Sequence, residues 1–161
     1  MLLYIIYFIL SPILWLMVTI ASIFNSKIRE NLFYFKSTLI SVHNQRKHIN
    51  KKVLLFHAAS SGEFEQLKPI LENINRKKYF IIQSFTSPTI YNQEHSTSLV
   101  DATCYQPFDF IWLSKLYFKL IRPDKYIITR HDIWPTHLLT ASNIGIECIL
   151  INANIHNNSI W

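Results

Sequence analysis

The sequence falls into two regions according to its pattern of hydrophobic and polar positions. Residues 1–24 are almost continuously apolar, and residues 1–26 contain no Asp, Glu, Lys or Arg. From about residue 53 onward, short apolar runs alternate with segments in which apolar residues recur at helical spacing. The first pattern predicts one long helix, and the second predicts alternating strands and helices.

The alternating region predicts a parallel sheet. Apolar runs rich in strand formers predict strands at 53–57, 79–85, 102–105, 125–129 and 147–152. Helical periodicity predicts helices at 63–76, 89–96, 110–121 and 135–143, with Asp109 as an N-cap and Gly145 near a helix end. Strict β–α alternation implies right-handed crossovers with helices on both faces of the sheet. We therefore expect an α/β, Rossmann-like domain over residues 53–161.

The apolar N-terminus is long enough to be a membrane helix. At a rise of about 1.5 Å per residue, about 24 residues extend roughly 36 Å, which exceeds a hydrocarbon layer of about 30 Å. Pro12 would kink this helix without excluding it. A cleaved signal peptide is the alternative, but it would require a basic start and a shorter apolar core. The sequence thus predicts a transmembrane anchor at residues 1–25.

Residues 26–52 form a basic segment that follows the anchor. Because the basic residues come after the apolar span, the positive-inside rule predicts that the rest of the chain is cytoplasmic. Cys104 and Cys148 show neither paired nor metal-ligand spacing, which agrees with a reducing compartment. Two structures are open for this segment, which we interpret as a juxtamembrane helix and linker. Its helix either lies on the membrane with its basic residues towards the headgroups, or packs on the globular domain.

Several kinds of function are excluded by what the sequence lacks. Its two glycines are far apart, so neither a dinucleotide-binding G-x-G-x-x-G nor a P-loop is present, and no G-x-S-x-G elbow occurs. His131, Asp132 and His137 show no established metal-ligand spacing. The basic residues of the domain are scattered, which disfavours a nucleic-acid surface. We expect no cofactor, no metal and no nucleic acid.

The stretch 57–71 is the main candidate for a functional site. A buried strand leads into Ser60-Ser61-Gly62-Glu63, and a helix follows, so Glu63 is placed at a helix start beside the carboxyl edge of the sheet. Gly62 would permit backbone angles and close approaches that a Cβ forbids. The alternative is structural, because Ser60-x-x-Glu63 also matches a capping box that satisfies backbone donors.

Three more polar clusters follow predicted strands. They are Thr86-Ser87-Pro88-Thr89, Pro107-Phe108-Asp109 and Thr129–Pro135, the last containing Arg130, Asp132 and Trp134. Each alone could be a helix cap. Several on one edge of the sheet predict a polar cleft for a polyhydroxylated or phosphorylated ligand.

These motifs resemble those of a known family. The ordered stretches His57–Glu63, Thr86–Thr89, Pro107–Asp109, Arg122–Asp124, Asp132–Pro135 and Asn152-Ala153, with the apolar start, are similar to the N-terminal half of bacterial Kdo (3-deoxy-D-manno-octulosonic acid) transferases of lipopolysaccharide synthesis. The resemblance implies a GT-B fold, in which the N-terminal domain receives the lipid A precursor and a C-terminal domain, absent here, binds CMP-Kdo. It also implies a bacterial inner-membrane location.

The resemblance implies a role for individual residues. Glu63 would be the general base of an inverting transfer of Kdo. The implied acceptor-binding residues are Ser60, Ser61, Gly62, Thr86, Ser87, Thr89, Arg130 and Asp132. Four positions depart from the family pattern: Arg130 replaces an acid, Ile90 a Gly, Thr136 an Asn, and Asn154 an Arg.

Two alternative functions are open. One is a catalytically silent, membrane-anchored module that binds the acceptor or lipid, either as a remnant or as half of a split enzyme, and the charge reversal at Arg130 favours it. The other is a generic α/β signalling domain, but the sequence lacks the acidic cluster expected there and the anchor would be unexplained.

Overall fold

The computed structural model describes residues 2–130 and 132–153. Its elements, in chain order, are α1 (Leu2–Phe24), α2 (Ser26–Arg46), β1 (Lys52–Ala58), α3 (Ser61–Glu72), β2 (Tyr79–Phe85), α4 (Pro88–Glu94), β3 (Ala102–Tyr105), α5 (Ile111–Ile121), β4 (Lys125–Thr129), α6 (Pro135–Asn143) and β5 (Glu147–Ile151). The strands and helices expected after residue 52 are confirmed. The largest difference is that the helix expected at 63–76 spans Ser61–Glu72.

The five strands form one parallel sheet in the order β3-β2-β1-β4-β5. In the register of the central strands, Leu55 of β1 is paired with Ile82 of β2 and with Tyr126 of β4. The chain order reverses around β1, so the switch point lies between β1 and β4. In open parallel sheets, ligands bind outside the carboxyl ends of the strands at this position.

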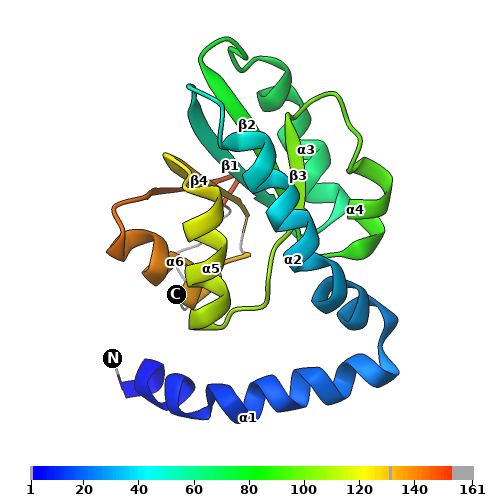
Figure 1. Cartoon of the computed structure of the whole chain (residues 1–161), viewed down its shortest axis with the longest axis vertical. Helices are drawn as coiled ribbons and strands as arrows, with labels where there is room; N and C mark the ends of the chain where they lie inside the picture. The colour runs from blue at the N-terminus through cyan, green and yellow to red at the C-terminus, as the bar shows by residue number, and fades with distance from the viewer. Residues whose placement is uncertain (1, 131, 154–161) are drawn as a thin grey trace.

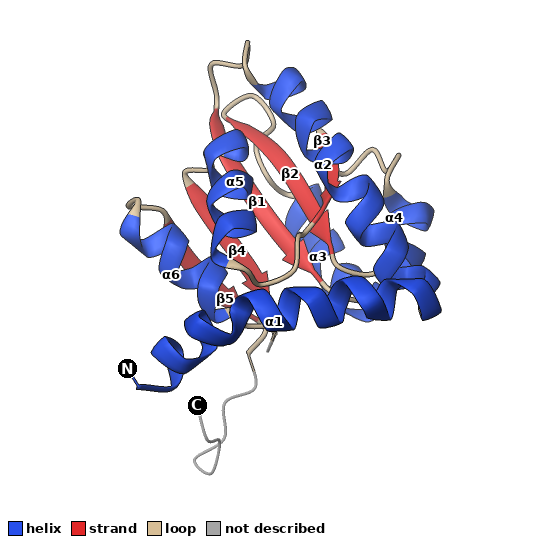
Figure 2. Ribbon diagram, turned by 60° about the horizontal axis from the view of Figure 1, so that its bottom comes forward, coloured by secondary structure: helices blue, strands red, loops and turns tan. Residues whose placement is uncertain are grey.

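Helices cover both faces of the sheet, as the α/β prediction requires (Figure 2). On one face, α2, α5 and α6 pack over side chains such as Leu55 and Tyr126, which are fully buried. On the other face, α3 buries Phe64 and Leu67 against alternate residues of the same strands. Burying one such Leu or Phe contributes about 1.5–3 kcal/mol, so both cores hold the sheet rigidly behind its edge.

The helix that follows the apolar region packs on the sheet. Phe35, Leu39 and Val42 of α2 are buried in the larger core. Their spacing of four and three residues places them on one helical face. The sequence leaves two arrangements open for the helix of the segment 26–52. The protein adopts the one in which this helix packs on the globular domain.

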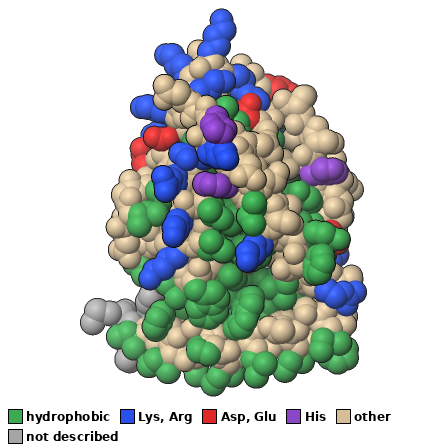
Figure 3. All heavy atoms as spheres, in the orientation of Figure 1, with side chains coloured by type: hydrophobic (Ala, Val, Ile, Leu, Met, Phe, Trp, Pro, Cys, Tyr) green, Lys and Arg blue, Asp and Glu red, His purple; other side chains and the backbone are tan. Residues whose placement is uncertain are grey.

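Helix α1 crosses one end of the domain (Figure 1). Its Trp15 ring packs edge-on against Phe110, with ring centroids 5.1 Å apart, and against Trp112 at 6.1 Å. Residues Ile5–Phe24 of this helix, with a mean hydropathy of 2.1, are long and apolar enough to cross a membrane. Hydrophobic side chains form a continuous band along this end of the molecule (Figure 3).

Strand β5 forms one edge of the sheet, and this edge is less covered than the central strands. Strand β5 pairs with β4, and the structure describes no partner for its other side within residues 2–130 and 132–153. Its Leu150 is 37% exposed. Helix α6 ends at Asn143, and Gly145 follows its C-cap Ile144 with a left-handed φ of 78°. Gly145 N–H donates to Ser142 O and Ile146 N–H to Ala141 O, which closes the helix end before β5.

Candidate functional site

The predicted polar clusters lie at the carboxyl edge of the sheet. The turn after β1 leads into α3, the turn after β2 leads into α4, and Arg130 and Asp132 follow β4. Because β1 lies between β2 and β4, these turns are neighbours although up to 75 residues separate them in sequence. The sheet therefore brings together most of the candidates on one side of its switch point.

Glu63 has both a structural role and access to solvent. The Ser60 Oγ accepts a hydrogen bond from Glu63 N–H at 3.4 Å, and Glu63 Oε2 accepts one from Ala59 N–H at 2.6 Å. This is a capping box shifted by one residue, because the glutamate reaches the residue before the N-cap. The Glu63 side chain is nevertheless half-buried and not sealed in the core.

Gly62 was expected to allow backbone angles or a close approach that a Cβ forbids, but the structure shows neither. Only Gly145 among the glycines has a positive φ, and a Cβ built on Gly62 would have nothing within 4 Å. The backbone of the turn therefore does not require glycine. The open space beside Gly62, together with exposed Ser60 and Ser61, leaves the start of α3 accessible.

A buried imidazole supports the carboxylate after β4. His57, at the end of β1, is fully buried, and its Nε2 lies 2.5 Å from Asp132 Oδ2. Its other nitrogen, Nδ1, is 3.0 Å from the Ser84 hydroxyl. The indole N–H of Trp134 donates to Asp132 Oδ1 at 2.7 Å. Both oxygens of Asp132 are thus held, while its side chain remains 22% exposed.

The electrostatics of this pair favour an ionised Asp132. Burial raises the pKa of its carboxyl, but the hydrogen bond and charge of His57, with the Trp134 N–H, outweigh that effect. The net pKa lies below the ordinary value for aspartate. Asp132 therefore provides a fixed negative charge at neutral pH at the carboxyl edge of the sheet, which we call the rim.

Of the three hydroxyls after β2, that of Thr86 lies near the same imidazole. Thr86 is half-buried, with Oγ1 3.5 Å from His57 Nε2. Ser87 occupies the N-cap of α4, but its side chain makes no capping hydrogen bond, and Thr89 is exposed. A hollow of about 220 Å³ lies beside them and is lined also by Lys27 and Asn31 of α2.

Arg130 extends over the first helix of the site. It follows β4 with a left-handed φ of 59°, is exposed, and donates from Nε to Gln66 Oε1 of α3 at 3.2 Å. Gln66 is one helical turn after Glu63. The Arg130 guanidinium thus contacts α3 one helical turn after the predicted base, at a position where the resemblance implies an acid.

Asp109 was predicted to cap the helix that follows it, and this prediction was wrong because it caps a different helix. Phe110, and not Asp109, occupies the N-cap of α5. The carboxylate of Asp109 instead accepts hydrogen bonds from Thr136 N–H at 3.1 Å and His137 N–H at 3.0 Å, at the start of α6. It also lies 2.8 Å from Nδ1 of the fully buried His137. The polar side chain caps a neighbouring helix because the two helices pack side by side.

Some predicted positions lie outside the described residues. They are His131 and Asn154, so nothing is said of their placement. Within residues 2–130 and 132–153, no group of three His, Cys, Asp or Glu side chains is arranged to hold a metal ion.

Sequence reasoning missed the partners that orient the rim. His57 lies in the candidate stretch 57–71 and Ser84 in a predicted strand, but the sequence assigns neither of them a contact with Asp132 or with each other, although a histidine closing an otherwise apolar run is a visible signal. Asn31 gave no signal in the sequence. It is 2% exposed, and its amide donates to the carbonyls of Thr86 and Gln106, each at 3.1 Å, which ties α2 to two loops of the rim.

Comparison with known proteins decides the family. The sequence profile of the family described as 3-deoxy-D-manno-octulosonic-acid transferase (kdotransferase) matches residues 27–161. The chain belongs to this family. It therefore carries the N-terminal part of a Kdo transferase, a type of glycosyltransferase, and the resemblance of its motifs is confirmed.

Two curated relatives agree with this assignment. The chain is 26% identical over 109 residues to a 3-deoxy-D-manno-octulosonic acid transferase of Chlamydia muridarum (strain MoPn / Nigg), which covers 65% of this chain and 25% of the relative. It is 25% identical over 103 residues to the enzyme of the same name from Aquifex aeolicus (strain VF5), covering 64% and 28%. The matched region is thus about a quarter of the length of each relative.

Proposed function

We propose that this chain is the acceptor-binding part of a Kdo transferase that moves Kdo from CMP-Kdo to a lipid A precursor, lipid IVA, in lipopolysaccharide core synthesis. Membership of the family over residues 27–161 supports the reaction class. Because the matched region is about a quarter of each relative, CMP-Kdo would be bound mainly by a C-terminal donor domain of a GT-B fold.

Glu63 is the proposed general base. The acceptor hydroxyl would attack the anomeric carbon of Kdo, its proton would pass to the Glu63 carboxylate, and CMP would leave with the electron pair of the broken bond, inverting the configuration. One observation carries this assignment. Glu63 Oε2 is fixed by Ala59 N–H at 2.6 Å, and the described residues give Oε1 no hydrogen-bond partner, so one carboxylate oxygen is oriented and the other is available.

The proposed acceptor site surrounds this carboxylate. Arg130 would attract a phosphate of the acceptor, and Asp132, held by His57 and Trp134, would accept hydrogen bonds from sugar hydroxyls. The remaining proposed contacts are the accessible rim positions Ser60, Ser61, Gly62, Thr86, Ser87 and Thr89. The mixture of one cation, one anion and several hydroxyls suits a phosphorylated sugar better than a simple anion.

A silent binding module is the second candidate. The hydrogen bond from Ala59 to Glu63 is also what a helix cap requires, and Arg130 places a positive charge one turn away through Gln66. In that case Glu63 would stabilise α3, and the chain would hold the acceptor without taking its proton.

The proposed location is the bacterial inner membrane, with the globular domain on the cytoplasmic side. The apolar α1 supports attachment, and the basic residues that follow it support the orientation. Attachment would keep the enzyme next to a lipid-borne acceptor and raise its effective concentration.

A transfer assay separates the two candidates. The chain would be fused to the C-terminal part of the Aquifex aeolicus relative and supplied with CMP-Kdo and lipid IVA. We expect Glu63→Gln to reduce the transfer rate at least about 100-fold while acceptor binding changes little. Glu65→Gln, two residues away on an exposed side chain, is the matched control and should keep the full rate.

The same assay has outcomes against the proposal. A fusion that binds lipid IVA but transfers no Kdo with Glu63 intact would support the silent module. Full transfer by Glu63→Gln would exclude this residue as the base. Residues 1–161 by themselves should show no transfer, because the matched region is only about a quarter of each relative and the proposed donor site would lie outside it.

A further inference from the structure

We propose that α1 lies in the plane of the membrane surface, as a helix embedded along its length, and does not cross the bilayer. The face of α1 that points away from the domain would be embedded in the lipid leaflet nearest the globular domain. The inference keeps the membrane attachment of the proposed function but replaces the transmembrane anchor expected from the sequence with an in-plane one. It does not depend on transferase activity.

The two faces of α1 have different partners. Tyr7, Ser11, Leu14, Trp15 and Val18 follow one another at helical spacing and form the face turned to the domain. The Tyr7 hydroxyl donates to Asp109 O, Ser11 is 4% exposed, and Leu14, Trp15 and Val18 pack against the larger core. This face docks α1 on the loop between β3 and α5.

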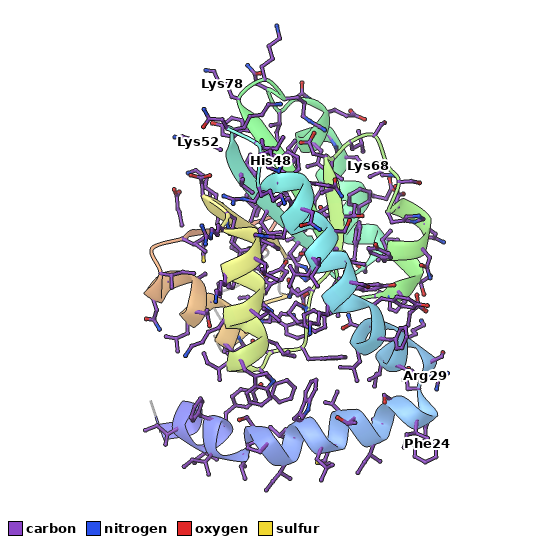
Figure 4. The ribbon with its side chains drawn as sticks, viewed as in Figure 1. Phe24, Arg29, His48, Lys52, Lys68 and Lys78 are labelled. Atoms are coloured by element: carbon purple, nitrogen blue, oxygen red, sulfur yellow. The ribbon has the colours of Figure 1, made fainter. Side chains whose placement is uncertain are left out.

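The outer face is apolar along the whole helix. Its large side chains are between 42% and 85% exposed; they are Ile5, Ile6, Phe8, Ile9, Leu10, Ile13, Leu16, Met17, Ile20, Ile23 and Phe24. A soluble monomer rarely exposes an apolar surface of this length. The band at the α1 end of the molecule carries this surface, whereas Lys52 and Lys78 lie at the opposite end (Figures 3 and 4). The molecule therefore has one apolar end and one strongly basic end.

The docking contacts are incompatible with a crossing helix. Contacts with the domain run from Tyr7 to Val18, about 17 Å along the helix axis at a rise of 1.5 Å per residue. If α1 crossed the bilayer with these contacts intact, the irregular loop that contains Asp109 would lie in hydrocarbon. Backbone polar groups of a loop are not tolerated there unless they are buried in protein. A helix lying in the interface needs a depth of only about 5–10 Å and leaves the loop above the acyl chains.

The surroundings of α1 suit the headgroup region. Trp112, 39% exposed, stacks on Phe110 with ring centroids 5.0 Å apart next to the Trp15 ring, and indoles prefer membrane interfaces. At the end of α1, Arg29 Nη1 donates to Ser22 O at 3.1 Å and to Ile23 O at 3.2 Å. Arg29 lies just above Phe24 in Figure 4, so a cation marks the boundary between the apolar helix and the domain.

This arrangement positions the candidate site towards the lipid. The hollow of about 220 Å³ beside Thr86 and Ser87 is bounded by Lys27 and Ile28, at the first turn of α2. The carboxyl edge of the sheet faces α1 (Figure 2). A lipid with its acyl chains in the bilayer could then present its polar head to the rim without leaving the membrane.

The test measures the depth of three equivalent positions. Ile6, Ile13 and Ile20 lie on the outer face and are 44%, 59% and 48% exposed. Each would be replaced singly by Cys in a Cys148→Ser background and labelled with a fluorophore. The remaining thiol, Cys104, is fully buried, and burial raises its pKa to about 12, so it should not react. The labelled full chain would be bound to phosphatidylethanolamine–phosphatidylglycerol vesicles with quenchers at known acyl positions.

An in-plane helix predicts equal quenching depths at all three positions, with Lys78→Cys as an unquenched reference. A crossing helix predicts that the label at 13 lies roughly 10 Å deeper than those at 6 and 20, because seven residues rise about 10.5 Å. That graded result, or a failure of the unsubstituted chain to bind the vesicles, would overturn the inference. Since no transfer is measured, a graded result would leave the transferase proposal standing.

Discussion

Nε2 of His57 lies 2.5 Å from Oδ2 of Asp132, across 75 residues of sequence and between two neighbouring strand ends. Because the imidazole is fully buried, the carboxylate cannot shift without breaking a contact with the core of the sheet. His57 at the end of β1 therefore holds the rim of the candidate site to the core of the sheet. The stability of the protein should depend on the charge of Asp132.

Asp132→Asn should lower the free energy of unfolding at pH 7 by about 1–3 kcal/mol, the usual cost of weakening a hydrogen bond to a buried charged group. The pKa of Asp132 is lowered in the folded protein, so its ionisation stabilises the fold above the ordinary aspartate pKa of about 3.9. That contribution is lost as the pH falls through the lowered value. Thermal unfolding in detergent at pH 7 and pH 3 should show the difference between the two proteins shrinking in acid. Glu65→Gln, whose side chain is 63% exposed, should change stability little at either pH.

His137 should make the protein less stable as the pH falls below about 6.5, the ordinary histidine pKa. Burial lowers the pKa of this imidazole, and the neighbouring Asp109 only partly offsets that effect. The unfolded chain then binds a proton that the folded chain resists, so stability rises with pH in this range. His137→Gln should flatten the change in melting temperature between pH 7.5 and pH 5, whatever its effect at pH 7.5. The exposed His95, changed to Gln, should leave the slope as it was. An unchanged slope in His137→Gln would show that another group is responsible.

The two glycines should respond differently to alanine. At Gly145, where φ is 78°, we expect Gly145→Ala to destabilise the protein by about 1 kcal/mol from backbone strain alone, since a Cβ there would meet nothing within 4 Å. At Gly62, which lies in the first turn of α3 without a positive φ, Ala should be neutral or stabilising by up to about 1 kcal/mol. Denaturant unfolding of the two variants provides a matched comparison. Equal destabilisation would contradict the assignment of strain to Gly145.

Arg130→Gly should stabilise the fold slightly even though it removes a side-chain contact. A non-glycine residue at φ 59° costs about 1 kcal/mol, and the hydrogen bond to Gln66 is exposed and therefore weak. In the same variant, binding of lipid IVA should weaken if Arg130 contacts a phosphate as proposed. Arg130→Lys, which retains the charge and the strained backbone, separates the two effects. A variant with lower stability and unchanged binding would contradict both expectations.

The elements could be predicted because their signals are local. The strand at residues 125–129 is a short apolar run, and Pro135 begins α6 where a first-turn proline belongs. The side-chain partners could not be predicted, because they depend on which strands become neighbours. Asp109 shows the difference clearly. Its capping ability was visible, but the helix that it caps starts 26 residues later and reaches it only through packing.

The candidate site was predictable in its position and not in its chemistry. The turn 60–63 and the polar residues after β2 and β4 were found because parallel strands end at one edge. The burial of His57 beneath Asp132 and the shift of the Glu63 hydrogen bond to Ala59 required coordinates. Helix α2 was ambiguous because its aromatic residues are on two faces; Phe35 is buried, while Phe33 is 74% exposed.

The uncovered side of β5 has a practical consequence for handling the protein. Within residues 2–130 and 132–153, the outer N–H and C=O groups of β5 have no partner strand, and Leu150 is partly exposed, so this edge is a template on which another chain can add a strand. Concentrated solutions of residues 1–161 should therefore self-associate through this edge even in detergent that fully covers α1. A charged substitution on this strand, such as Leu150→Lys, is the natural first step for keeping the chain monodisperse.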